Sequence, residues 1–156
     1  MTKFILTIIC AIAVIFNCDA YQQNFDVRTP SNVSVEKLEK KFKGSALQGT
    51  GIYFLEAQQK YGINAVFLAS IAMHESANGK SRNARTKNNF FGIMKNGRLR
   101  KFDSKRDCIM FAANNLTRKG GLYFGKKRYT VRSIGKKYAT CPHWSTRVIK
   151  HMKSFS

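Results

Sequence analysis

The sequence predicts a mainly α-helical fold with a small irregular or two-stranded excursion. Residues Ile63–His74 are apolar nearly all round, as expected for a helix in the core, and residues 143–155 carry an apolar stripe at helical spacing. Residues 76–101 are instead rich in Gly, Asn, Arg and Lys, and Asn96-Gly97 is a typical two-residue hairpin turn. A chain of 156 residues has the size of one domain.

Helices in the N-terminal half are predicted from caps and apolar spacing. Residues 21–34 are polar and irregular. Ser34 can then cap a short helix that ends near Lys43, after which glycines interrupt the chain. A second helix is predicted over Ile52–Lys60, and the buried helix over Ile63–His74 follows it.

The C-terminal half contains three more predicted helices. Ser104 can cap a helix over residues 105–118. A short helix is predicted near 131–138 and a last one over 143–155. Trp144, the one tryptophan of the chain, is expected to anchor this last helix in the core.

The first twenty residues have the layout of a secretory signal peptide. Lys3 precedes the apolar run Phe4–Phe16, and Cys18-Asp19-Ala20 offers small residues at positions −3 and −1 of a cut after Ala20. Two alternatives are an uncleaved membrane anchor and a lipid on Cys18. We expect cleavage and a secreted or periplasmic protein, with residues 21–45 forming a lead and a short helix before the main domain over 46–156.

Export changes the interpretation of the cysteines. Cleavage after Ala20 leaves Cys108 and Cys141, and two thiols in an oxidising compartment suggest one disulfide. The alternative, weighed equally, is that Cys108 is an apolar residue on a buried helix face. No Cys or His spacing typical of a metal site occurs, so we expect neither a metal nor another cofactor.

The charge is strongly positive and unevenly distributed. The chain has 28 Lys+Arg against 8 Asp+Glu, and from residue 57 onward there are 22 basic residues and three acids, Glu75, Asp103 and Asp107. Such a field favours an anionic polymer as partner, whether a cell-wall polymer, lipopolysaccharide, a membrane face or nucleic acid. With 44% hydrophobic residues, a disordered basic tail is excluded.

Glu75 is the acid with the most suggestive position. It directly follows the apolar helix, where a carboxyl group would be partly withdrawn from water. Desolvation raises the pKa of a carboxyl group in general, and a general acid needs such a rise near neutral pH. The alternative is that Glu75 pairs with one of the nearby cations, such as Lys80 or Arg82.

Four short segments of the sequence resemble the motifs of a known protein family. They are INAVFLA at 63–69, MHESANGKS at 73–81, KNNFFGI at 87–93 and YATCPHW at 138–144. In this order they resemble the bacterial N-acetylglucosaminidase family of peptidoglycan hydrolases, glycoside hydrolase family 73. The resemblance covers about residues 46–155 and implies a lysozyme-like α lobe with a groove for a glycan strand.

The resemblance also implies roles for individual residues. Glu75 matches the general acid of the family, and Tyr138 matches a tyrosine of the cleft that is important for activity. The segment Asn88, Asn89, Phe90, Phe91 and Gly92 matches the residues that line the floor of the cleft and bind substrate. We expect at least one of the two phenylalanines to belong to the core instead.

The sequence departs from the family pattern at two places. Family members usually carry Asp after Tyr-Ala-Thr, but here Cys141 follows, so a disulfide to Cys108 could hold that turn. A second catalytic carboxylate is often placed on the hairpin, but residues 93–101 contain no acid. Asp103 is the nearest candidate, and it could equally cap the following helix.

Together these observations predict a monomeric enzyme that cleaves the β-1,4 glycan backbone of peptidoglycan at N-acetylglucosamine. Its partners would be glycan strands and anionic cell-wall polymers, without obligatory nucleic acid. A muramidase or lytic transglycosylase of the same fold group is the first alternative. A non-catalytic binder of anionic envelopes or nucleic acid is the second, because aromatic residues are interspersed with basic ones at 123–129.

Overall fold

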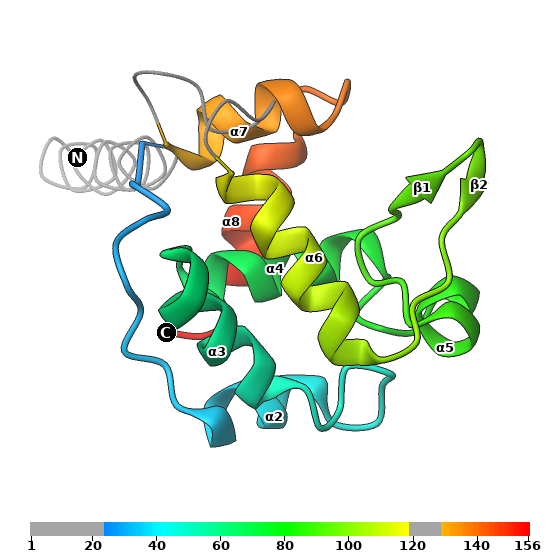
Figure 1. The fold of residues 1–156 in the computed structure, drawn as a ribbon. Coiled ribbons are helices and arrows are strands. Elements are labelled where there is room, and N and C mark those ends of the chain that lie inside the picture. Colours follow the sequence, from blue (N-terminus) through cyan, green and yellow to red (C-terminus); the bar gives the residue numbers. More distant parts are fainter. Residues whose placement is uncertain (1–23, 119–128) are drawn as a thin grey trace, which may run out of the picture.

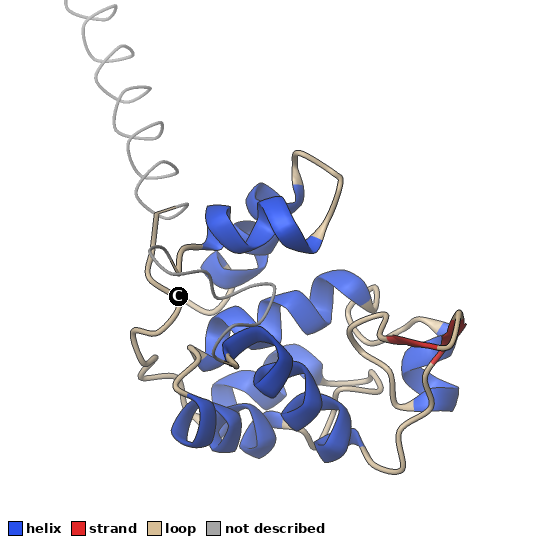
Figure 2. Cartoon of the chain, turned by 45° about the horizontal axis from the view of Figure 1, so that its top comes forward, coloured by secondary structure: helices blue, strands red, loops and turns tan. Residues whose placement is uncertain are grey.

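The computed structural model describes residues 24–118 and 129–156. Within them lie seven helices, of which α4 packs between α3 and α8, and a small hairpin extends from one side of the molecule (Figure 1). The predicted signal peptide at 1–20 lies outside the described residues, as does most of the basic and aromatic segment at 123–129. The mainly helical prediction is therefore confirmed, and the helices account for nearly all regular structure in Figure 2.

The N-terminal part contains helices α2 (Val35–Phe42) and α3 (Gly51–Tyr61). The hydroxyl of Ser34 accepts a hydrogen bond from the backbone N–H of Lys37 and so caps α2 as predicted. Between the helices, the carboxylate of Glu39 accepts hydrogen bonds from the backbone N–H groups of Gly49 at 2.7 Å and Gly51 at 2.5 Å. Glu39 thereby fixes the start of α3 against α2.

Helix α4 (Ala65–Glu75) runs through the centre of the core. Every residue from Phe67 to Met73 is buried, which confirms the prediction of a helix that is apolar all round. The side chain of Asn64 caps it by accepting a hydrogen bond from the N–H of Phe67 at 2.8 Å. Helices α3 and α8 (Trp144–Lys153) pack against α4, so its C-terminal residue is held by a rigid support.

The excursion consists of helix α5 (Arg82–Lys87) and a two-stranded antiparallel sheet, β1 (Met94–Lys95) and β2 (Arg98–Leu99). Asn96 and Gly97 have φ angles of 51° and 73°, as a tight hairpin turn requires, so the predicted turn is confirmed. Helix α5 was not predicted from the sequence, which indicated a loop here. Both elements lie at one edge of the molecule, and the strands are red in Figure 2.

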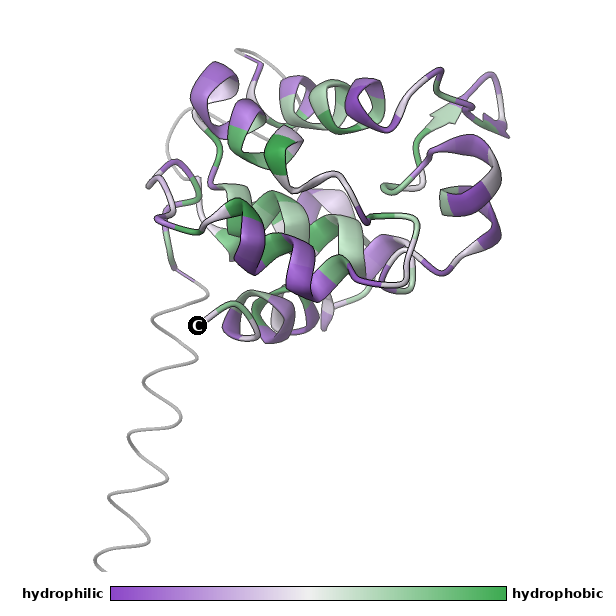
Figure 3. Ribbon diagram, turned by 90° about the horizontal axis from the view of Figure 1, so that it is seen from below, coloured by the Kyte–Doolittle hydropathy of each residue, from purple (hydrophilic) through white to green (hydrophobic). Residues whose placement is uncertain are grey.

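Helices α6 (Lys105–Thr117) and α7 (Val131–Tyr138) complete the fold with α8. Helix α6 packs on α3, and an ion pair between Arg106 and Glu56 links the two helices at the surface. In Figure 3, most helices carry both hydrophilic residues (purple) and hydrophobic residues (green). Of the helices in the described ranges, none is long and apolar enough to cross a membrane.

Candidate active site

Glu75 is the last residue of α4, and its partly buried side chain lines a cleft of about 350 Å³. The cleft collects residues from the hairpin arm, from α6 and from α7. They are Phe91, Gly92, Ile93, Met94, Ala112, Asn115, Leu116 and Tyr138. The structure thus brings four predicted site residues together: Glu75, Phe91, Gly92 and Tyr138. Among the described residues that line the cleft, Glu75 is the single carboxylic acid.

The chain turns sharply after Glu75, and this turn fixes the end of α4. The buried Ser76 hydroxyl donates to the carbonyl of Ala72 at 2.6 Å and accepts from the N–H of Gly79 at 2.8 Å. Ala77, Asn78 and Gly79 all have positive φ angles. Two non-glycine residues in the left-handed region are held there at some conformational cost, which indicates a strongly determined turn.

The carboxylate of Glu75 is oriented by Trp144. The indole Nε1–H of Trp144 donates a hydrogen bond to Oε1 of Glu75 at 2.8 Å. Trp144 is only 2% exposed, which confirms its predicted place in the core. Its contact with Glu75 could not be predicted from the sequence, because the two residues are 69 positions apart and no local pattern joins them.

Tyr138 connects Trp144 to the opposite wall of the cleft. Its ring stacks on the indole of Trp144, with ring centroids 4.9 Å apart and an interplanar angle of 29°. Its hydroxyl donates a hydrogen bond to the carbonyl of Phe91 at 3.3 Å. A continuous set of contacts therefore runs from Glu75 through the two aromatic rings to the segment containing Phe91.

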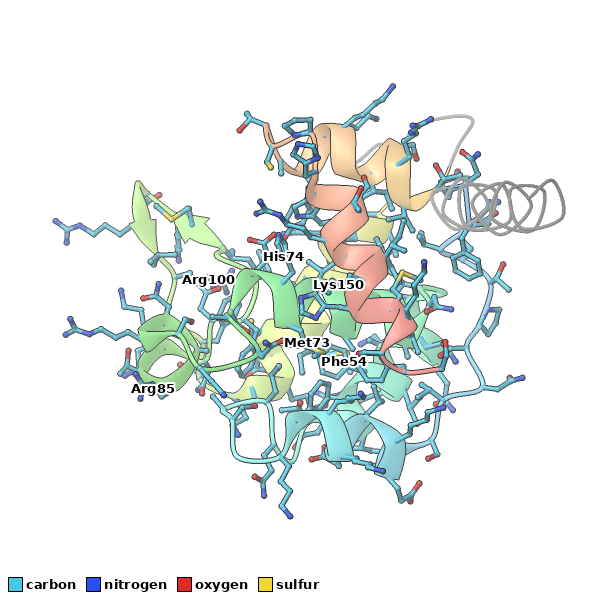
Figure 4. All side chains as sticks on the ribbon, turned by 180° about the vertical axis from the view of Figure 1, so that it is seen from behind. Phe54, Met73, His74, Arg85, Arg100 and Lys150 are labelled. Carbon is cyan, nitrogen blue, oxygen red and sulfur yellow. The ribbon has the colours of Figure 1, made fainter. Side chains whose placement is uncertain are left out.

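Two histidines adjoin this aromatic pair. The His74 ring meets Trp144 edge-on with centroids 6.5 Å apart, and it lies 6.1 Å from the ring of His151. Burial, with help from His74 and Lys150, lowers the pKa of His151. Figure 4 shows His74 on α4 beside α8, which carries Lys150. A neutral imidazole is therefore favoured at His151 inside the folded protein.

The predicted substrate-binding segment divides into structural and cleft-lining residues. Asn89 is 2% exposed, and its amide bonds only to backbone: it donates to the carbonyls of Ile93 and Arg100 and accepts from the N–H of Ile93. The buried Asn89 amide thus holds the arm together through its backbone bonds, and its contact with substrate stays a prediction. Phe90 is fully buried in the core, whereas Phe91 reaches the cleft.

Asn88 and Gly92 flank these residues with left-handed backbone. Asn88 ends α5 with φ of 51°, and its amide donates to the carbonyl of Phe102 at 3.1 Å. Asn88 does not line the cleft that contains Glu75, so the structure does not bring it to the predicted site. Gly92, with φ of 65°, does line that cleft and is exposed.

Asp103 lies apart from Glu75. It is exposed and lines two hollows beside the hairpin, neither of which contains Glu75. Nor does Asp103 cap α6: Ser104 is the cap, and its hydroxyl bonds to the backbone N–H and the carboxylate of Asp107. The structure therefore does not bring the candidate second carboxylate into the cleft.

The predicted disulfide is not formed. Cys108 and Cys141 are both free, the first fully buried in α6 and the second exposed after α7. Burial raises the pKa of the Cys108 thiol to about 12. The alternative interpretation of Cys108, an apolar residue on a buried helix face, describes the structure correctly. Cys141 instead lines a separate hollow of about 660 Å³ at the junction of α7 and α8, whose described lining includes no carboxylic acid.

Comparison with known proteins places this geometry in a family. A family model described as mannosyl-glycoprotein endo-beta-N-acetylglucosaminidase matches residues 51–156. A Streptococcus pneumoniae serotype 4 protein assigned as an endo-beta-N-acetylglucosaminidase is 30% identical over 141 residues, which is 81% of this chain and 21% of that protein. The bifunctional autolysin of Staphylococcus aureus strain N315 is 42% identical over 57 residues, 36% of this chain and 5% of the relative. The chain thus spans about a fifth or less of these relatives.

Solved structures give the same picture. The crystal structure of S. aureus autolysin E superposes with a TM-score of 0.73 and 25% identity, covering 88% of this chain and 72% of that one. A catalytic glutamate-to-alanine mutant of autolysin E, in complex with the disaccharide NAG-NAM, gives a TM-score of 0.72 at 24% identity, with 86% and 71% covered. The predicted fold class is thereby confirmed.

Proposed function

The chain belongs to the glucosaminidase family of peptidoglycan hydrolases, and from this premise we propose that it cleaves the peptidoglycan glycan backbone with Glu75 as general acid. The observation that carries the proposal is the position of Glu75: the single carboxylic acid among the described lining of a cleft with aromatic walls. A catalytic mutant of the related autolysin E replaces a glutamate, which supports the same choice of residue.

The hydrogen bond from Trp144 gives the two oxygens of Glu75 different tasks. An indole N–H can donate but cannot accept, so Oε1 faces a permanent donor and is the oxygen that serves as acceptor. The acidic proton is then carried by Oε2. We propose that Oε2–H protonates the glycosidic oxygen as the bond to the anomeric carbon breaks.

The walls of the cleft suit a sugar. Phe91 and Tyr138 supply aromatic surface, and Asn115 on α6 supplies an amide that can bond to hydroxyl or acetamido groups. Autolysin E has been crystallised with the disaccharide NAG-NAM and with the muropeptide NAM-L-ALA-D-iGLU. We propose the corresponding ligand here, an N-acetylglucosamine-containing glycan strand.

Asp103 is outside the cleft, and this leaves two mechanisms. The acetamido oxygen of the substrate can attack the anomeric carbon, after which Glu75 takes a proton from the water that opens the intermediate. Alternatively, a water attacks directly without a carboxylate base and inverts the configuration. In both, Glu75 supplies the proton for the leaving oxygen, so both predict the same dependence on this residue.

The test compares wild type with Glu75→Gln on purified peptidoglycan. Glutamine keeps the shape of the side chain but cannot supply the proton, so hydrolysis should fall by about a hundred- to ten-thousand-fold. New reducing ends are counted, and mass spectrometry identifies the terminal sugar. Asp103→Asn is the matched control, and it should have a small effect because Asp103 lies outside the cleft.

Two outcomes would contradict this proposal: wild type that lyses no peptidoglycan, or Glu75→Gln that lyses it at the wild-type rate. A loss in Asp103→Asn as deep as that in Glu75→Gln would make Asp103 the second catalytic carboxylate. The first outcome would leave the non-catalytic binder as the remaining interpretation. We further propose secretion after cleavage of residues 1–20, which the mass of protein recovered outside the cytoplasm would test.

A lytic transglycosylase is the second candidate, favoured by the same lone carboxylic acid in the described cleft lining. One carboxyl group that first donates and then accepts a proton can close an anhydro ring on the substrate without water. Its products are lighter than hydrolytic products by one water molecule. Mass spectrometry of the digest therefore separates the two reactions directly.

A further inference from the structure

Asn115 is the residue of the described cleft lining whose polar side chain is still unused. The polar side chains of that lining belong to Glu75, Asn115 and Tyr138. Glu75 accepts the hydrogen bond from Trp144, and the hydroxyl of Tyr138 donates to the carbonyl of Phe91. Among the described residues, by contrast, the side-chain amide of Asn115 has no hydrogen-bond partner. Its N–H donors and its carbonyl acceptor are therefore available to a ligand.

Asn115 lies on a wall that is otherwise apolar. Ala112 and Leu116, on the same helix α6, line the cleft with it, and these two residues are only 4% and 2% exposed. Ala112 precedes Asn115 by three positions and Leu116 by four, so the three side chains share one face of the helix. A group that bonds to the half-buried amide of Asn115 therefore also contacts apolar surface.

The cleft is small enough for one sugar to contact both Glu75 and Asn115. Its volume of about 350 Å³ is near the lower end of the range for ligand pockets. Its hairpin side consists of Gly92, Ile93 and Met94 and adds no charged side chain. A sugar that places its glycosidic oxygen at Glu75 therefore has its substituents in the same small cleft as the amide of Asn115.

An acetamido group matches the wall on α6 better than a hydroxyl group does. Its N–H and its carbonyl can pair with the acceptor and the donors of the Asn115 amide. Its methyl group can pack on Ala112 and Leu116, whereas a hydroxyl has no apolar part to bury there.

The ammonium group of an N-deacetylated sugar suits the same wall poorly. It would bring a charge against the apolar surface of Ala112 and Leu116, which costs free energy unless an opposite charge compensates it. Glu75, the single carboxylic acid of the described lining, is neutral in its acid form and gives no such compensation. An ammonium also cannot donate and accept at once, so part of the Asn115 amide would lose its partner.

We propose that Asn115 determines substrate specificity by binding the acetamido group of the sugar in the cleft, so that N-deacetylated strands bind poorly. The inference rests on the proposed function, because it assumes that a glycan strand occupies the cleft. The recognised class of substrate is thus a strand that keeps its N-acetyl groups, and removal of these groups should protect a strand from the enzyme.

The experiment measures binding in the Glu75→Gln background, in which the probe is not consumed. The probes are peptide-free glycan fragments of peptidoglycan and the same fragments after removal of their N-acetyl groups. Re-acetylated fragments control for the chemical treatment. The acetylated probe should bind at least about tenfold more tightly, and Asn115→Ala should weaken its binding by about tenfold, the usual effect of leaving a polar group unpaired. Binding of the deacetylated probe should change little.

Two further variants make this result specific. Asn114→Ala is the matched control, because Asn114 is the next residue of α6 but is exposed and lines a different hollow. It should leave the binding of both probes unchanged. Asn115→Asp keeps the shape of the side chain but places a carboxylate on the wall, so the preference should shift toward the deacetylated probe and its ammonium groups. A misfolded variant cannot produce such a gain, and thermal unfolding checks the fold of each protein.

Three outcomes would overturn the proposal. The first is equal binding of the two probes when Asn115 is intact. The second is an Asn115→Ala variant that binds like Asn114→Ala. The third is an Asn115→Ala variant that binds both probes more weakly to the same extent, because Asn115 would then bond to a hydroxyl group. Failure of the hydrolase proposal appears separately, as a wild type that cuts no strand while the preference between the probes persists.

Discussion

Trp144 is the residue that orients the carboxylate of Glu75, the proposed general acid. Trp144→Phe removes the N–H that bonds to Oε1 of Glu75 but keeps a ring to stack on Tyr138. We expect kcat to fall by about tenfold or more, the effect of one lost hydrogen bond to a charged group. KM should change little, because Trp144 does not line the cleft. Steady-state kinetics on soluble glycan strands measures both.

Tyr138→Phe provides the comparison for this variant. It also keeps the stacked ring pair, but it removes the hydroxyl that donates to the carbonyl of Phe91. The hydrogen bond from Trp144 to Glu75 stays intact. A rise in KM with kcat preserved in Trp144→Phe would contradict an orienting role. An unfolding temperature close to that of wild type would show that lost activity is not lost structure.

The two thiols should differ sharply in reactivity. Cys141 is exposed, whereas Cys108 is buried and its thiol pKa is about 12, so Cys108 stays protonated near neutral pH. Alkylation of the native protein at pH 8 should modify Cys141 alone, and denaturation should expose both. Mass spectrometry of the peptides reports each site. Two unreactive thiols in the native protein would revive the disulfide, and two reactive ones would contradict the burial of Cys108.

The position of Glu75 in the fold could be predicted from local sequence. The apolar run before it predicts a buried helix, and Glu75 is the last residue of that helix. The buried position of Asn89 could not be predicted, because its amide bonds to backbone groups 4 and 11 residues away, in an arm whose path is irregular. The role of Trp144 was missed for the same reason, since a contact across 69 residues leaves no periodic signal.

Helices with a cap and an apolar face were predicted well. Ser34 and Ser104 cap α2 and α6 as expected, and the helix bounds agree within a few residues. Helix α5 was missed because its sequence, RNARTK, buries only Ala84 and so has no apolar stripe. Its one local signal is Ser81, whose hydroxyl accepts from the N–H of Ala84.

The contact between α7 and α8 is close at Gly135. A Cβ added there would clash with Oγ of Ser145 and would lie 2.9 Å from a ring carbon of Trp144. We expect Gly135→Ala to destabilise the protein by about 1–3 kcal/mol through overpacking. The better helix propensity of alanine should offset up to about 1 kcal/mol of this loss. Thermal unfolding measures the loss, and kcat should fall as well if the indole of Trp144 moves away from Glu75.

Ser145→Ala is the matched partner for this variant. Since Oγ of Ser145 is the nearest atom, the double variant Gly135→Ala/Ser145→Ala should recover part of the lost stability. Full additivity of the two single changes would mean that the predicted clash does not occur. Gly135→Ala with wild-type stability would mean that α7 and α8 can separate at no cost.

Fold and charge of the whole molecule follow from different features of the sequence. The fold could be predicted because the central helix and the surrounding caps agree on one packing. The cleft could be predicted only in part, since only tertiary packing brings its hairpin wall next to its wall on α6. The charge is a sum over the chain and can be counted from the sequence, with a formal net value of +20. Within the described ranges only two ion pairs join a basic to an acidic side chain, so most basic residues there are not paired with an acid.

Binding to cell walls should therefore depend strongly on ionic strength. From residue 57 onward, 22 basic residues face three acids, and salt screens exposed charges over about 8 Å at physiological strength and less at higher salt. Sedimentation of the Glu75→Gln variant with purified walls should decrease between ~0.05 M and ~0.5 M NaCl. An uncharged glycan such as chitin is the control, because binding through the cleft alone should respond little to salt. Equal salt dependence of binding to walls and to chitin would show that the cationic surface does not hold the protein to anionic polymers. Wall binding that is retained at ~0.5 M NaCl would show that the affinity comes from the cleft.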